Sequence, residues 1–144
     1  MKMLSFLMQD SLVQVSSSNT GDVDKDLIVS RLNYIKSQEN FEWVYSHKVH
    51  YLNIPISFDI ETSSFYEGVA KKAIMYIWTC NVNGTTFIGR TWKQFTQFLD
   101  IMSEVFGLIK YNKRCLIYVH NLEYEFQFMR KWFDWHDIFA DDKR

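Results

Sequence analysis

The sequence has few of the residues that would cross-link the chain or charge it strongly. Its 144 residues include two cysteines and one proline, and the formal net charge is −1. A charge this close to zero provides no general attraction to nucleic acid, so any contact with DNA must be local, through stacking and metal. Cys80 and Cys115 lie in apolar strand-like segments without Cys-x-x-Cys spacing, which favours free buried thiols in a reducing cytosol over a disulfide or a zinc site.

Long hydrophobic runs are also missing. The longest apolar stretch, around 73–80, is far too short to span a bilayer, and no basic, apolar and small-residue leader opens the chain. We therefore expect a cytoplasmic protein that is not secreted and has no membrane partner. The sequence does have a hydrophobic fraction of 47% and an aromatic fraction of 17%, which are ample for the core of a single domain.

The N-terminal part predicts one helix. Acidic residues at 22–26 are expected to open it, and apolar residues then recur at helical spacing through Ile35. His47 and His50 follow in segment 43–51, which is typical of a strand; no third ligand has recognisable spacing, so we interpret both as structural or solvent-facing. We treat 1–48 as an N-terminal extension with one helix and 49–144 as the main unit, the two forming one compact body.

The main unit predicts alternating strands and helices. Pro55 interrupts the first strand and suggests a bulge or an edge approach. Asn83-Gly84 is the strongest short hairpin signal, and Thr91 and Gly107 are expected to begin and end a helix. The predicted order is strand, strand, strand, helix, strand and helix, over residues 49–60, 74–82, 85–89, 91–107, 114–119 and 122–132.

The most informative segment is Phe58-Asp59-Ile60-Glu61-Thr62, at the end of the first predicted strand. Side chains alternate along a strand, so Asp59 and Glu61 project from one side while Phe58 and Ile60 project from the other. Two carboxylates held this close repel each other, and Mg²⁺ or Mn²⁺ would neutralise them. By itself, Asp-x-Glu on a surface strand is more often a solvated polar face.

A second motif, His-Asn-Leu-Glu-Tyr-Glu at 120–125, lies where the last predicted strand runs into the last helix. Together with Phe-Asp-Ile-Glu-Thr-Ser at 58–63, it resembles the first two exonuclease motifs of family B DNA polymerases, in particular their protein-primed phage and organellar branch. That family carries Asp-x-Glu-Thr and His-Asn-Leu-x-Phe/Tyr-Asp. The resemblance covers about 49–144 and implies an α/β fold, a truncated RNase H-like (DnaQ-like exonuclease) mixed sheet with flanking helices. Three antiparallel strands followed by a crossover into a parallel strand are what that fold requires.

The resemblance implies a proofreading 3′–5′ exonuclease that hydrolyses the 3′ end of single-stranded DNA during replication, in the cytoplasm of a phage-infected bacterium or a similar setting. Asp59, Glu61 and Glu125 would be the catalytic carboxylates and the ligands of two Mg²⁺ or Mn²⁺ ions. For the aromatic residues core packing is the default interpretation, and for His120 a loop role is an equal alternative. The residues that would hold the DNA are Thr62, His120, Asn121, Tyr124 and Phe128.

Two departures from the family pattern keep three interpretations open. Glu125 stands where the family has Asp, and its extra methylene would displace one of the two ions, leaving one or none. The family's third motif, Tyr-x-x-x-Asp, does not follow Glu125. The chain is thus interpreted as a partial exonuclease module, as an impaired phage-type binding or regulatory protein that reuses the scaffold, or as one half of a split polymerase completed by another polypeptide.

Overall fold

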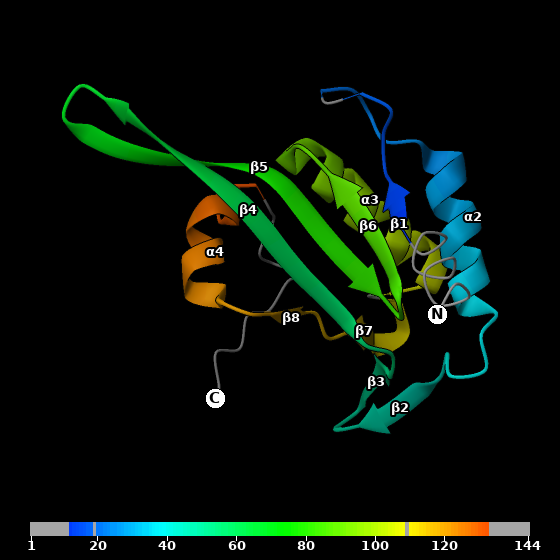
Figure 1. Ribbon diagram of the computed structural model, residues 1–144. Helices are drawn as coiled ribbons and strands as arrows, with labels where there is room; N and C mark the ends of the chain where they lie inside the picture. The colour runs from blue at the N-terminus through cyan, green and yellow to red at the C-terminus, as the bar shows by residue number, and fades with distance from the viewer. Residues whose placement is uncertain (1–11, 19, 109, 133–144) are drawn as a thin grey trace, which may run out of the picture.

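The computed structural model describes residues 12–18, 20–108 and 110–132. A five-stranded sheet has the order β1-β6-β5-β4-β8, and a three-stranded sheet has the order β2-β3-β7 (Figure 1). None of the described helices is long and apolar enough to cross a membrane. The elements in chain order are β1 (Leu12–Gln14), α2 (Lys25–Lys36), β2 (Trp43–Ser46), β3 (Val49–Leu52), β4 (Ile56–Glu67), β5 (Ala70–Val82), β6 (Thr85–Gly89), α3 (Trp92–Phe106), a 3₁₀ turn (Lys110–Asn112), β7 (Lys113–Cys115), β8 (Tyr118–Val119) and α4 (Leu122–Met129).

The larger sheet has the predicted mixed topology. β4, β5 and β6 pair antiparallel in succession, and β8 then pairs parallel to β4. The chain crosses from β6 to β8 through α3, which packs beside α2 on the sheet (Figure 1). β1 adds a parallel strand next to β6. The N-terminal segment thus contributes a strand to the same sheet and, through α2, apolar side chains to the same core.

The core lies between the larger sheet and the two helices α2 and α3. Phe58 of β4 stacks on Phe95 of α3 with ring centroids 4.4 Å apart, and Trp78 of β5 packs 4.8 Å from the same ring. Along β4 these buried positions alternate with exposed ones, so Asp59 and Glu61 both lie on the side away from the core. The predicted alternation is confirmed.

The predicted ends of the helix over 91–107 are confirmed as well, whereas the helix predicted over 122–132 ends earlier, at Met129. The Thr91 side chain accepts a hydrogen bond from the Gln94 N–H at 3.1 Å, which caps the start of α3. Gly107 ends α3 with a φ of 67°, a left-handed conformation that glycine adopts without steric cost. Asp24 caps α2 in the same manner as Thr91 caps α3, through the Leu27 N–H.

Three predicted strands have different bounds in the structure. Pro55 does not bulge one strand but separates β3 from β4, which belong to different sheets. Segment 43–51 is a hairpin of β2 and β3 rather than one strand, since His47 and Lys48 turn the chain with φ values of 50° and 65°. Segment 114–119 divides because β7 pairs with β3 whereas β8 pairs with β4.

The largest difference concerns β4, which does not end near the two carboxylates. It continues to Glu67 and pairs with β5 all the way to a tight turn, where Gly68 has a φ of 64°. Residues 62–75 form a two-stranded ribbon that projects from the body, which we call the arm (Figure 1). Backbone pairing between the two strands maintains the arm, of which Met75 alone among residues 62–75 is buried in the core.

Both cysteines are free thiols, as predicted. Cys80 is fully buried on β5, and burial raises the pKa of its thiol far above the usual range. Cys115 on β7 is half-buried, and burial raises its pKa to about 11. Neither thiol therefore ionises at neutral pH.

Candidate functional site

The site forms where the edge of β4 is left without a neighbouring strand. β8 pairs with β4 at Ser57 and Phe58 and then ends, because the chain turns into α4. In the part of the chain that the structure describes, α4 rather than a strand lies beside the next residues of β4 (Figure 1). The first turn of α4 can therefore reach β4 from the side.

Asp59 and Glu125 meet at this edge. Glu125 is 3% exposed, whereas Asp59 is exposed. The pKa of Glu125 is raised to about 7, first by burial, then by a hydrogen bond with Asp59 and by the negative charge of Asp59, while a hydrogen bond from the Ile60 backbone acts in the opposite direction. At neutral pH, Glu125 thus exists as a mixture of acid and carboxylate.

One oxygen of this pair is unsatisfied. Glu125 Oε2 is buried and has no hydrogen-bond partner among the described residues. A buried carboxylate oxygen without a partner destabilises the folded state, and a cation shared with Asp59 would satisfy it. The donor set is chemically suited to Mg²⁺ or Mn²⁺, because both ions prefer carboxylate oxygens.

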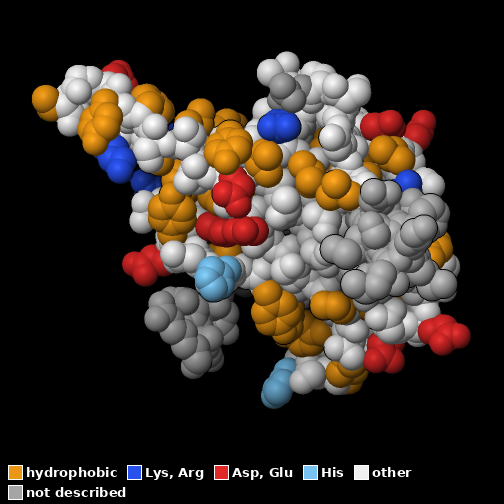
Figure 2. Space-filling view, viewed as in Figure 1, with side chains coloured by type: hydrophobic (Ala, Val, Ile, Leu, Met, Phe, Trp, Pro, Cys, Tyr) orange, Lys and Arg blue, Asp and Glu red, His pale blue; other side chains and the backbone are white. Residues whose placement is uncertain are grey.

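Glu61 does not complete a three-carboxylate cluster in this conformation. It is exposed on the same side of β4 as Asp59. Within the described ranges, however, no three Asp, Glu, His or Cys side chains come close enough together to hold a metal ion. The structure therefore brings Asp59 and Glu125 together and leaves Glu61 at the rim, where acidic side chains are visible beside the foot of the arm (Figure 2).

The second contact between the two motifs is made by hydroxyl groups. Thr62 Oγ1 lies 3.0 Å from Tyr124 OH, which joins the foot of the arm to α4. The Tyr124 ring is 41% exposed and contacts Phe128 edge-on, with centroids 5.2 Å apart. Phe128 is half-buried against the core, so Tyr124 is the aromatic side chain of α4 that is open to a ligand here.

Asn121 and His120 precede α4 in different roles. The Asn121 side chain accepts a hydrogen bond from the Tyr124 N–H at 3.3 Å and caps the helix. None of the hydrogen bonds among the described residues uses its amide nitrogen, which can donate to a ligand. His120 is exposed in the turn between β8 and α4. Both lie next to the Asp59 and Glu125 edge, because that edge begins where β8 ends.

The sequence analysis missed one group of this site, the backbone amide of Ile60. This amide hydrogen-bonds to Glu125 and lies 3.0 Å from Asp59 Oδ1. No residue pattern could have identified it, because its availability depends on where β8 stops pairing. The nearest signal in the sequence was that the predicted strand 114–119 ends at Val119, immediately before His120.

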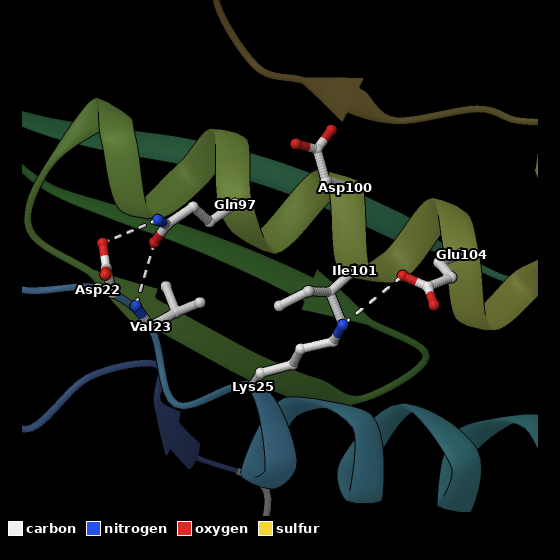
Figure 3. Close-up of a pocket in the computed structure, with 7 residues that line it drawn as sticks. All are labelled: Asp22, Val23, Lys25, Gln97, Asp100, Ile101 and Glu104. Atoms are coloured by element: carbon white, nitrogen blue, oxygen red, sulfur yellow. Dashed lines mark hydrogen bonds and ion pairs between the residues drawn. The ribbon is translucent and has the colours of Figure 1, made fainter.

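A cleft of about 310 Å³ lies elsewhere, between the N-terminus of α2 and one face of α3 (Figure 3). Its polar groups pair mostly with one another: Gln97 Nε2 donates to Asp22 at 2.9 Å, and Lys93 lies 2.9 Å from the same carboxylate. The hydrogen bond from Gln97, followed by the effects of Lys93, lowers the pKa of Asp22. These contacts fasten the segment before α2 to α3 and give no reason to place a reaction there.

Comparisons with protein-family models, with curated proteins and with solved structures found no match to this chain. The two motifs and their contacts are therefore the features of this chain that indicate a function.

Proposed function

We propose that this chain is an RNase H-like 3′–5′ exonuclease module that takes the 3′ end of single-stranded DNA. The observation that carries the proposal is the contact between Asp59 and Glu125, which are distant in sequence and belong to the two motifs. The bond between Thr62 and Tyr124 joins the same two motifs a second time. The mixed strand order, with β8 parallel to β4 and α3 in the crossover, supports the fold assignment.

In this proposal, Asp59 and Glu125 hold a Mg²⁺ or Mn²⁺ ion, and Glu61 at the rim is the third carboxylate. The bound metal supplies an activated water and stabilises the departing 3′ oxygen. Glu125 must lose its proton before it can bind a cation, so occupancy rises with pH through about 7. The exposed ring of Tyr124 stacks on the terminal base, and Asn121 donates a hydrogen bond from its amide.

A second function is favoured by the position of Glu61. The described carboxylates form a pair rather than a trio, and Glu125 is partly protonated at neutral pH. A protein with this site would bind a single-stranded end through the same groups without cleaving it. Such a protein would act as a binding or regulatory module on the same scaffold.

One assay distinguishes the two functions: release of nucleoside monophosphates from a 3′-labelled single-stranded oligonucleotide with Mn²⁺ or Mg²⁺. An exonuclease releases label from the wild type and not from the Asp59→Ala/Glu61→Ala variant. The matched control is Ser57→Ala/Ser63→Ala, which changes exposed residues on the same side of β4 and should keep the activity.

Glu125→Asp sharpens the outcome. If the wild type releases nothing but Glu125→Asp does, the site is an exonuclease site impaired by the longer side chain, and the binding function describes the natural chain. If neither protein releases label in either metal, the exonuclease proposal is wrong.

A further inference from the structure

Beyond Glu61, the side of β4 that carries the carboxylates continues along the arm. β4 alternates without interruption, so Ser63, Phe65 and Glu67 lie on the same side as Asp59 and Glu61. Each of these five residues is exposed. The opposite side of β4 faces the core at its inner end. The carboxylate side is therefore the open one from the site to the tip of the arm.

On β5, a bulge determines which residues belong to this side. Glu61 pairs with Ile77 but Thr62 pairs with Met75, so Tyr76 is an extra residue between them. Met75 therefore remains on the core side, where it is 6% exposed. Farther along the arm, even-numbered residues of β5 are on the carboxylate side, because cross-strand partners share a face. The pairs are Ser63 with Ile74, Phe65 with Lys72 and Glu67 with Ala70.

These residues form a continuous surface, which we call the carboxylate-side strip: 59, 61, 63, 65 and 67 on β4 with 70, 72, 74, 77 and 79 on β5. Apolar side chains lie along its middle. Ile77 is half-buried, Ile74 is 55% exposed and Phe65 is 46% exposed. Figure 2 shows hydrophobic side chains along the arm and acidic side chains at its foot. Exposed apolar side chains bordered by polar ones are typical of a surface that a ligand covers.

The outer end of the strip carries an exposed ion pair. Lys72 Nζ lies 2.6 Å from Glu67 Oε2, and both side chains are more than half exposed. An ion pair this exposed contributes little to stability, so a phosphate can replace the carboxylate as the partner of the ammonium group. Lys72 also lies directly across from Phe65. One cross-strand pair thus offers a ring to a base and a cation to the neighbouring phosphate.

We propose that the carboxylate-side strip binds the single-stranded DNA upstream of the 3′ end held at the carboxylate site. Phe65 stacks on a base, and Lys72 exchanges Glu67 for a phosphate. The distance from Asp59 to Phe65 along an extended strand is about 20 Å, enough for about six stacked nucleotides. This inference rests on the proposed function for the polarity and class of its ligand.

The test is binding of fluorescent oligodeoxythymidine to the full chain, by fluorescence anisotropy in EDTA, so that no hydrolysis occurs. An oligonucleotide of about three nucleotides ends before Phe65, whereas one of about ten reaches it. We expect Phe65→Ala to weaken binding of the longer one about tenfold and of the shorter one by less than about twofold. Tyr66→Ala is the matched control, because Tyr66 is 72% exposed and lies on the opposite side of the arm. It should change either affinity by less than about twofold.

The ion pair gives a second test, in which binding should become tighter. Glu67→Gln removes the competitor for Lys72, so the longer oligonucleotide should bind about fivefold more tightly at about 0.1 M salt. The slope of log affinity against log salt should steepen by about 0.7. Glu104→Gln is the matched control, since Glu104 is an exposed residue of α3 whose ion pair is with Lys25. This control should change neither quantity, and a gain in affinity cannot come from a variant that fails to fold.

Several outcomes would overturn the inference. It is wrong if Phe65→Ala and Tyr66→Ala weaken binding equally, if wild type does not prefer the longer oligonucleotide, or if Glu67→Gln binds no more tightly than Glu104→Gln. It is also wrong if oligouridine of the same length binds more tightly through Phe65. Sedimentation would overturn it by showing that Phe65→Ala abolishes self-association while DNA binding is unchanged. Circular dichroism checks that each variant folds.

The nuclease assay is independent of this one. If wild type releases no label but binds the longer DNA through Phe65 and Lys72, the exonuclease proposal fails and the arm inference survives. If wild type releases label, and Phe65→Ala and Glu67→Gln bind and cleave like wild type, the arm inference fails alone.

Discussion

The inner and outer halves of the β4–β5 hairpin are made of the same two strands but differ in how much of their surface is buried. In the inner half, alternate residues such as Ile60 and Trp78 are buried, and the other side of β4 carries the carboxylates. In the outer half, the arm, Phe65 and Tyr66 are both substantially exposed although they point to opposite faces. One continuous hairpin can therefore be part of the core and also extend beyond it, because pairing alone maintains a strand there.

The two halves should differ most in how they tolerate loss of an aromatic side chain. Trp78 of the inner half is fully buried, whereas Tyr66 of the arm is 72% exposed. We expect Trp78→Ala to lower the free energy of unfolding by about 3–5 kcal/mol, since it leaves a cavity under α3. Tyr66→Ala should lower the free energy of unfolding by less than about 0.5 kcal/mol. Urea unfolding followed by circular dichroism measures both, and equal losses would mean that the outer half is not independent of the core.

The second largest effect is expected at the carboxylates, where the halves join. Because the folded-state pKa of Glu125 is raised from 4.5 to about 7, its stabilising contribution is complete below pH 4.5 and is lost as the pH rises through about 7. Over this pH range, wild type should lose about 3 kcal/mol of unfolding free energy relative to Glu125→Gln. Urea unfolding across this pH range measures it. If the free energy of unfolding depends on pH in the same way for wild type and for Glu125→Gln, Glu125 is not buried in its protonated form.

A smaller effect is expected where the arm meets α4. Thr62→Val and Tyr124→Phe each remove one hydroxyl of a partly exposed hydrogen bond, which is worth about 1 kcal/mol. Because they remove the same bond, the double variant should lose no more than either single variant. A double-mutant cycle from urea unfolding tests this, and fully additive losses would show that the two hydroxyls do not interact.

The smallest effect should come from removing most of the arm. If residues 64–73 are replaced by Asn-Gly, Ser63 and Ile74, which already pair, are joined by a two-residue hairpin turn. The free energy of unfolding should stay within about 0.5 kcal/mol of wild type. Differential scanning calorimetry is the measurement. A large drop would show that the arm stabilises the body.

The sequence predicted the parts of this hairpin that bury apolar residues or carry turn signals. Asn83-Gly84, Thr91 and Gly107 mark local conformations, so the ends of the elements next to them were predicted correctly, whereas the start of β5 at Ala70 was not. The arm was missed because Ser63 to Glu67 shows no apolar alternation. The turn at His47-Lys48 was missed because it contains no glycine, proline or asparagine, although histidine is among the residues that adopt left-handed φ values more often than most.

For the candidate site, the sequence predicted that Asp59 and Glu125 would be close, but not that Glu61 would lie apart from them in the described structure. The same-side placement of Asp59 and Glu61 follows from strand geometry, and their motif suggested Glu125. The burial of Glu125 depends on β8 ending at Val119, which lets α4 reach β4. Such tertiary contacts set the protonation state of a carboxylate, and a residue pattern does not record them.

The unreactive native thiols make the arm open to direct observation. Cys80 is buried and Cys115 has a pKa near 11, so neither competes well for a maleimide at neutral pH. A single cysteine introduced at Val69, the fully exposed tip of the arm, would carry a fluorophore without removal of any natural residue elsewhere. Its rotational freedom could then be followed in solution as the chain meets a ligand.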